Sequence, residues 1–130
     1  MKVRVIKLKD GERINLQNNS WSCHLLNKNI VGSKKAMLGV STFTPGTDTP
    51  QKVHDDEEEL CFVIKGKGSI TVGEEEVPFR TSSAVYIPPG VPHGVRNTGD
   101  EDVVMVYVFS YPEYPPTHDA GEPEGGKNVQ

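Results

Sequence analysis

The sequence lacks a long apolar run, a cysteine framework and an excess of basic residues. A helix that spans a bilayer needs about 20 consecutive apolar residues, so we expect no membrane span. The two cysteines, Cys23 and Cys61, are too few for a disulfide framework and are not spaced as a zinc knuckle, so we expect reduced thiols. Fourteen basic and eighteen acidic residues give a formal charge of -4, which disfavours nucleic acid and anionic lipid as partners.

Signals for export are also missing from the N-terminal residues. The start MKVR leads directly into alternating residues, without a long apolar segment or a small-residue cleavage site. We therefore expect a cytoplasmic protein. The length of 130 residues predicts one domain, because a second core would have too little chain.

No segment shows a long helical periodicity. Ten prolines and thirteen glycines interrupt the chain, and several segments alternate with a period of two. This pattern predicts an all-β fold that opens with a hairpin around Asp10-Gly11. Strands are expected at residues 3–8, 13–16, 36–43, 59–64, 69–72, 76–79, 84–87, 93–97 and 103–109, the last covered on both faces. Residues 18–35 fit either a short strand or a helical turn.

The spacing of these strands favours a jelly-roll barrel of antiparallel strands, in which closure removes exposed edges. From Tyr111 onward the chain has four prolines and little aliphatic content. We therefore expect a barrel with its N-terminal hairpin at residues 1–112 and a flexible Pro/Gly/acidic tail at residues 113–130. His118, in that tail, is expected to be incidental.

A proline-rich turn delivers one of the four histidines to the start of a strand. His93 directly follows the segment Pro88-Pro89-Gly90-Val91-Pro92, and Asn97 comes four residues after His93. This pattern resembles the second motif of the cupin superfamily, which reads Pro-X-Gly, two residues, His, three residues, Asn. The glycine that usually leads the motif is replaced by Ser82. We expect Asn97 to hydrogen-bond backbone groups near the turn.

The first cupin motif is matched with one departure. Gly46, His54, Glu59 and Gly66 fall in register, but Lys52 stands where the family usually has its first histidine. Charge runs usually face solvent, so the alternative for the acidic segment around His54 is an exposed surface. The match of both motifs favours the resemblance, which implies a cupin fold without fixing the reaction.

The resemblance implies a metal site formed by His54, Glu59 and His93. Two imidazoles and one carboxylate suit a divalent transition metal, so Fe, Mn, Ni or Zn is expected. A bound ion would polarise an oxygen of a small-molecule substrate. The ligand set favours a non-haem dioxygenase, and an isomerase or lyase acting on a sugar-like or carboxylate substrate is the alternative.

The functional hypotheses differ in the role that they give to Lys52. Because residues 52 and 54 lie on one face of a strand, the Lys52 side chain should point inward with His54. In an enzyme, Lys52 would be catalytic, by orienting a substrate anion or moving a proton. In a non-catalytic binding protein, the Lys52 ammonium would replace the metal and pair with Glu59.

Four further residues are candidates for the pocket wall, although each is also a typical core residue. They are Cys61, Tyr86, Met105 and Tyr107. Glu57 and Glu58 are expected to face water, because only Glu59 has the required spacing to Gly66. Family resemblance also implies a homodimer, with the N-terminal hairpin as the candidate interface.

Overall fold

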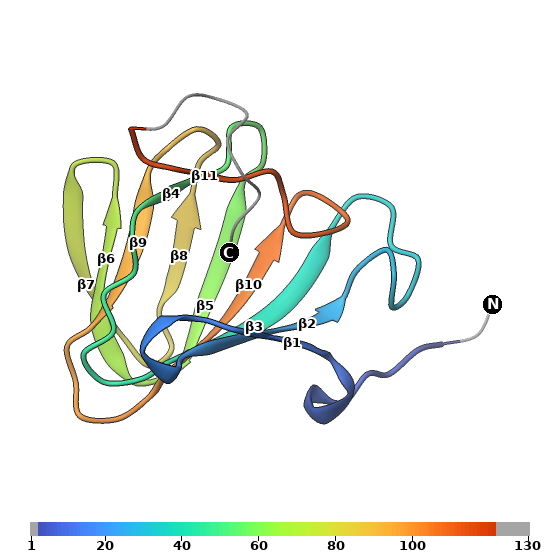
Figure 1. Ribbon diagram of the computed structural model, residues 1–130, viewed down its shortest axis with the longest axis horizontal. Coiled ribbons are helices and arrows are strands. Elements are labelled where there is room, and N and C mark those ends of the chain that lie inside the picture. Colours follow the sequence, from blue (N-terminus) through green and yellow to red (C-terminus); the bar gives the residue numbers. More distant parts are fainter. Residues whose placement is uncertain (1–2, 122–130) are drawn as a thin grey trace.

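The computed structural model describes residues 3–121 and has two antiparallel sheets (Figure 1). The first sheet contains, in spatial order, β1 (Glu12–Asn15), β2 (Trp21–Leu26), β3 (Met37–Phe43), β10 (Val103–Phe109), β5 (Glu59–Lys65) and β8 (Ala84–Ile87). The second contains β11 (His118–Asp119), β4 (Lys52–Val53), β9 (His93–Asn97), β6 (Lys67–Val72) and β7 (Glu75–Arg80). Within the described residues, helical structure is limited to two 3-10 turns, η1 (Leu8–Asp10) and η2 (Gln17–Asn19).

The all-β jelly-roll prediction is confirmed, although the two sheets do not close into one continuous barrel. None of the helical turns in residues 3–121 is long and apolar enough to cross a membrane. Residues 18–35, which the sequence left undecided, contain the strand β2.

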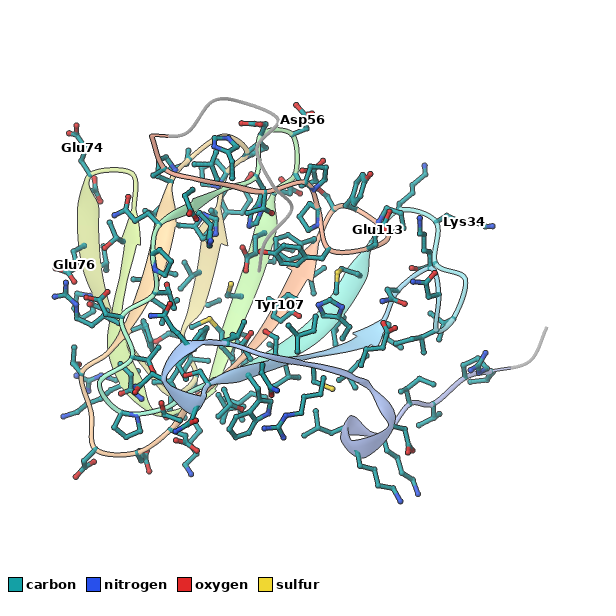
Figure 2. The ribbon with its side chains drawn as sticks, in the orientation of Figure 1. Lys34, Asp56, Glu74, Glu76, Tyr107 and Glu113 are labelled. Atoms are coloured by element: carbon teal, nitrogen blue, oxygen red, sulfur yellow. The ribbon has the colours of Figure 1, made fainter. Side chains whose placement is uncertain are left out.

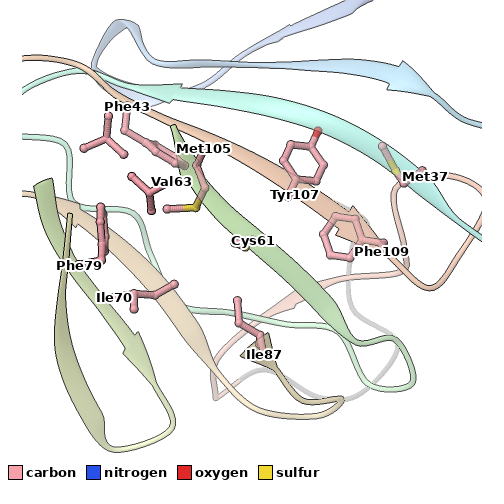
Figure 3. Packing of buried hydrophobic residues seen from close by; sticks show 11 residues of the cluster. Met37, Phe43, Cys61, Val63, Ile70, Phe79, Ile87, Met105, Tyr107 and Phe109 are labelled. Atoms are coloured by element: carbon pink, nitrogen blue, oxygen red, sulfur yellow. The ribbon is translucent and has the colours of Figure 1, made fainter. Parts of the chain in front are cut away.

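The core lies between the sheets and is built mainly from alternate residues of β10 and β5 (Figure 3). Met105, Tyr107 and Phe109 point inward from β10 and are 2–4% exposed, whereas the intervening residues of that strand are only half-buried. The prediction that residues 103–109 are covered on both faces is therefore wrong, because the outer-face residues of β10 keep part of their surface exposed, beside Leu60 and Phe62, which are both 46% exposed. Each fully buried side chain of this size stabilises the fold by about 1.5–3 kcal/mol.

The N-terminal hairpin differs from the prediction. Residues 3–7 form no strand, and β1 pairs with β2. Asn18 and Asn19 reverse the chain between β1 and β2 with positive φ angles of 54° and 57°, a conformation that asparagine tolerates well. Val3 and Val5 remain 78% and 84% exposed. The alternating apolar residues of this segment therefore do not pair with another strand in residues 3–121.

The expectation of a flexible tail from residue 113 is wrong as far as Gly121, and residues 122–130 lie outside the described part. β11 pairs with β4, and Thr117 is 2% exposed. The segment crosses over the upper end of the sheets in Figure 1, where it is coloured red. Its few apolar side chains, such as Tyr114, are enough to pack it against the core, and its backbone hydrogen bonds complete the attachment.

Candidate metal centre

Three side chains from both sheets converge at one end of the interior. His54 follows β4 and His93 opens β9 in one sheet, while Glu59 opens β5 in the other. The Nε2 atoms of His54 and His93 lie 3.5 and 3.2 Å from the same Glu59 oxygen, Oε1. One ligand atom from each residue lies within 4.8 Å of the other two, a spacing that could hold a metal ion. The structure thus brings together the three residues that the motifs select.

The backbone links the two sequence motifs directly. The turn between β8 and β9 contains Gly90, whose positive φ of 76° is the left-handed conformation that glycine favours. Its amide donates a 2.7 Å hydrogen bond to the carbonyl oxygen of His54. The Asn97 side chain donates to the carbonyl oxygens of Phe43 and Glu101, as expected for a structural residue, and so secures the end of β9.

The site is buried and carries a full negative charge on Glu59. Burial raises the pKa of this carboxyl, but the hydrogen bonds and charges of His54 and His93 outweigh burial and hold the pKa at about 2. Burial lowers the pKa of His93, whereas its hydrogen bond to Glu59 and the charge of that carboxylate raise the pKa overall. Glu59 is therefore ionised at neutral pH and attracts a cation.

The outer nitrogen of each imidazole also has a partner. His93 Nδ1 lies 3.1 Å from the carbonyl oxygen of Val91. Since a carbonyl oxygen only accepts, Nδ1 carries a proton. The hydrogen bond from Nε2 to Glu59 uses a second proton in the metal-free protein, and a metal that displaces it would find a lone pair on Nε2. His54 Nδ1 lies 2.8 Å from the Thr117 hydroxyl oxygen.

A cavity of about 400 Å³ adjoins the three residues. Aromatic side chains, including Phe43, Tyr107 and Phe109, form much of its wall. Ser22 and Ser41 place hydroxyl groups along the wall, and these two oxygens are 2.5 Å apart. A small molecule with an apolar body and several oxygens fits this lining.

Lys52 lines the cavity but does not pair with Glu59. Its ammonium group donates to Asp119 Oδ1, and its side chain is 18% exposed. Asp119 stands opposite Lys52 in the β4–β11 pairing, which explains the choice of partner. The expected metal-free alternative, a Lys52–Glu59 pair, is therefore wrong, and two imidazoles occupy the surroundings of Glu59 instead.

The four candidates for the pocket wall divide between three environments. Tyr107 lines the cavity and lies inside the molecule (Figure 2). Charged side chains such as Glu74 and Asp56, by contrast, project from the outside of the molecule. Cys61 and Met105 are buried in the core, and the Cys61 thiol donates to Glu59 Oε2 over 3.4 Å. Tyr86 is 53% exposed, so the prediction that it lines the pocket is wrong: β8 turns this residue to the outer face.

Sequence reasoning missed several residues near the site. Tyr114 lines the cavity, and its ring packs edge-on against His54 with centroids 5.8 Å apart. Thr117 contacts His54, and His118 pairs with Asp55 over 3.1 Å instead of being incidental. The only signal in the sequence was the aromatic Tyr114 in an otherwise polar tail.

The prediction that Glu57 faces water is also wrong, because it is only 9% exposed. Burial and the charge of Asp56 raise its pKa. Glu57 does not belong to the group of residues that could hold a metal, whereas Glu59 does. The spacing to Gly66 therefore selected the acidic residue of that group correctly.

Comparison with known proteins finds a matching family model and several similar proteins. The family model of the cupin domain matches residues 39–109. The polyketide synthase protein CurC of Streptomyces cyaneus is 29% identical over 85% of this chain and 71% of its own length. An oxalate-binding protein of Thermotoga maritima is 25% identical over 66% of this chain and 71% of its own length. The structure of the polyketide cyclase RemF of Streptomyces resistomycificus superposes with a TM-score of 0.77, at 20% identity, over 96% of this chain and 89% of RemF.

Proposed function

This chain belongs to the cupin family, and from that premise we propose that it is a metal-dependent enzyme acting on a small oxygenated metabolite. The observation that carries the proposal is the convergence of three ligand atoms, from His54, Glu59 and His93, within 4.8 Å of one another. The adjoining cavity of about 400 Å³ gives a substrate access to the same point.

The donor set fits a divalent transition metal such as Fe, Mn, Ni or Zn. His54 and His93 would coordinate through Nε2 and Glu59 through Oε1, the atoms that face one another. When bound, the ion supplies a positive centre that polarises a substrate oxygen and lowers the pKa of bound water. Three protein ligands leave further coordination positions for the substrate.

Lys52 would bind and orient a negatively charged group of the substrate. It is the only lysine or arginine lining the cavity in the described part of the chain, and its ammonium group already pairs with a carboxylate, that of Asp119. A substrate carboxylate or enolate would compete with Asp119 for this ammonium group. The aromatic wall would take the apolar part of the molecule.

Two reaction classes fit the site. Two histidines and one carboxylate are the ligand set of non-haem iron oxygenases, which supports the dioxygenase. The relation to CurC and RemF supports redox-neutral chemistry on an enolisable polycarbonyl substrate, as in a cyclase, isomerase or lyase. Turnover of aromatic diols and 1,3-diketones with and without oxygen separates the classes, because only the dioxygenase consumes oxygen and stops under anaerobic conditions.

The alternative is a metal-loaded protein that binds a small acid without converting it. Similarity to the oxalate-binding protein favours this reading. If calorimetry shows that oxalate binds and assays show no turnover of uronates, ketoses, diols or diketones, the proposed enzyme function would be wrong and the binding function would take its place.

Metal analysis tests the proposal that both readings share. The protein is purified without an affinity tag or chelator and compared with His54→Ala and Glu59→Gln. We expect close to one ion per chain in the parent and a sharp loss in both variants, whereas Glu58→Gln, next to the site, should keep the metal. Absence of metal from the parent even after reconstitution would overturn the proposal.

The family resemblance also leads us to propose a homodimer, formed through the outer face of the first sheet instead of the expected N-terminal hairpin, whose residues 3–7 form no strand. Leu60, Phe62 and Tyr86 project from the outer face of the first sheet and are 46%, 46% and 53% exposed. Adjacent exposed apolar side chains of this size commonly mark an interaction surface. A second copy of the chain would cover them.

A further inference from the structure

We infer that Thr117 is a positioning residue: its hydroxyl group holds the His54 imidazole in the tautomer that carries the proton on Nδ1 and leaves Nε2 free to coordinate. Thr117 lies outside residues 39–109, the part matched by the cupin family model. The role in coordination rests on the proposed function, but the tautomer itself can be measured without a metal.

The directions of two hydrogen bonds carry the inference. Thr117 Oγ1 lies 2.8 Å from the carbonyl oxygen of Pro115 and 2.8 Å from His54 Nδ1. A carbonyl oxygen only accepts, and a hydroxyl group has one proton, so that proton is directed to Pro115. The hydrogen bond between Thr117 and His54 must then use the proton of Nδ1.

The opposite arrangement is unfavourable. If the Thr117 hydroxyl donated to His54 Nδ1, the lone pairs of Thr117 Oγ1 and of the Pro115 carbonyl would face each other at 2.8 Å. Thr117 is 2% exposed and His54 is 3% exposed, so bulk solvent does not weaken that repulsion. The hydrogen bond to Thr117 therefore keeps a proton on Nδ1, in competition with Glu59, which favours a proton on Nε2.

The consequence appears at the other side of the ring. His54 Nε2 faces Glu59 Oε1, 3.5 Å away, and in the metal-free protein it holds a second proton directed at this carboxylate. Because Nδ1 keeps its own proton, a metal that displaces the Nε2 proton would find a lone pair there. His93 reaches the same state through the Val91 carbonyl. The main chain thus fixes one imidazole, whereas the other depends on a side chain that can be substituted.

The segment that carries Thr117 is held firmly on both sides. Before it, the Lys28 amide donates to the carbonyl oxygen of Pro112 over 2.7 Å. After it, β11 pairs with β4, and the Ala120 amide donates to the carbonyl oxygen of Gln51 over 2.9 Å. Partners that hold the second nitrogen of a metal-binding histidine typically change metal affinity 10- to 100-fold when removed.

Nitrogen-15 NMR of histidine-labelled full-length protein tests the tautomer, with His54 assigned by its loss in His54→Asn. The metal-free parent should show a protonated Nδ1 at His54, and in the zinc-loaded parent Nδ1 should stay protonated while Nε2 carries no proton. Thr117→Val has a similar shape but no acceptor, so the proton should shift toward Nε2. Zinc affinity measured by calorimetry should fall about 10- to 100-fold. Thr117→Ser should restore both properties.

Thr81→Val is the matched control, because Thr81 lies in the turn after β7 and should leave the His54 spectrum and zinc affinity unchanged. If Thr117→Val does not fold, Thr117→Ala makes the same comparison. A His54 Nδ1 without a proton in the parent, or parental spectra and affinity in the folded valine or alanine variant, would overturn the inference. A parent that shows the tautomer contrast but binds no zinc supports the tautomer role of Thr117 and overturns the proposed metal function.

Discussion

The two carboxylate oxygens of Glu59 have different neighbours. Oε1 faces both imidazoles, while Oε2 accepts from the thiol of Cys61 over 3.4 Å. Burial and the charge of Glu59 raise the pKa of the Cys61 thiol, so the thiol stays protonated and can donate. This division directs Oε1 toward the position that a metal would take.

The metal-free and metal-loaded proteins should respond oppositely to pH. The pKa of His93 is raised in the folded state, so its pairing with Glu59 stabilises the metal-free protein below about pH 6.5 and is lost as pH rises through the raised value. The contribution of Glu59 disappears only as pH falls toward its lowered pKa of about 2. In the metal-loaded protein, protons compete with the ion for imidazole lone pairs, so stability should rise with pH over the histidine range.

Urea unfolding at about pH 6 and about pH 8, with and without zinc, measures both trends. The metal-free protein should be more stable at the lower pH and the zinc form at the higher pH. His93→Gln should lose the metal-free trend. Parallel trends with and without zinc would contradict the assignment of the two imidazoles and Glu59 to one coupled site.

Substitution of Lys52 and Asp119 should change anion binding in opposite directions. Lys52→Met removes the ammonium group that would hold a substrate anion, so oxalate affinity should fall about tenfold, or 1.4 kcal/mol. Asp119→Asn removes the competing carboxylate and should raise the affinity. Calorimetry on the zinc-loaded variants measures both effects, with equal metal content as the control. Weaker binding in Asp119→Asn would show that Asp119 supports the site instead of competing for Lys52.

Sequence spacing could predict the three converging residues but not the partners that orient them. Glu59 and His93 open strands and His54 follows one, so the spacing within each motif fixes where its residues stand relative to the strand ends. Lys52 and Asp119 are 67 positions apart, and His54 and Thr117 are 63 apart. A polar, proline-containing segment gave no periodic signal for those long-range contacts, so it was predicted as a flexible tail.

At the scale of elements, alternation predicted strands better than it predicted their neighbours. β3 and β10 lie at the expected positions, and their alternate residues face the core. The same signal failed in residues 3–7, where alternating residues form no strand. Alternation reports a preference for one buried face, but the pairing partner depends on the rest of the fold.

The turn between β5 and β6 should tolerate no side chain at Gly66. Its φ is 94°, and an added Cβ would lie 2.7 Å from the carbonyl oxygen of Asp102. Gly66→Ala should therefore destabilise the protein by about 1–3 kcal/mol beyond the backbone strain. Gly32→Ala is the control for strain, because Gly32 has a φ of 71° and open space around it. Equal losses in urea unfolding for both variants would contradict a steric role for the close contact.

At the scale of the whole molecule, the first sheet has a second apolar face opposite the core. Strand pairing places Phe62, Val106 and Val40 in one row across three strands. Leu60, Val108 and Leu38 form the next row on the same face. A sheet with apolar residues on both faces needs a cover on each, and within residues 3–121 the chain covers only one.

A second copy of the chain can cover this face, and the proposed dimer predicts what one charge would do. Phe62→Lys places an ammonium group in the first row, beside Val106 and Leu60, where burial in a dimer would leave the charge unpaired. We expect light scattering to give the mass of a dimer for the parent and of a monomer for Phe62→Lys. Val77→Lys is the matched control, because Val77 is also 46% exposed but lies on β7 in the other sheet, and it should remain dimeric. A monomeric parent, or dimeric Phe62→Lys, would exclude this face as the interface, since a stable dimer buries about 1,200–2,000 Å² and its buried apolar part is depleted of charged residues.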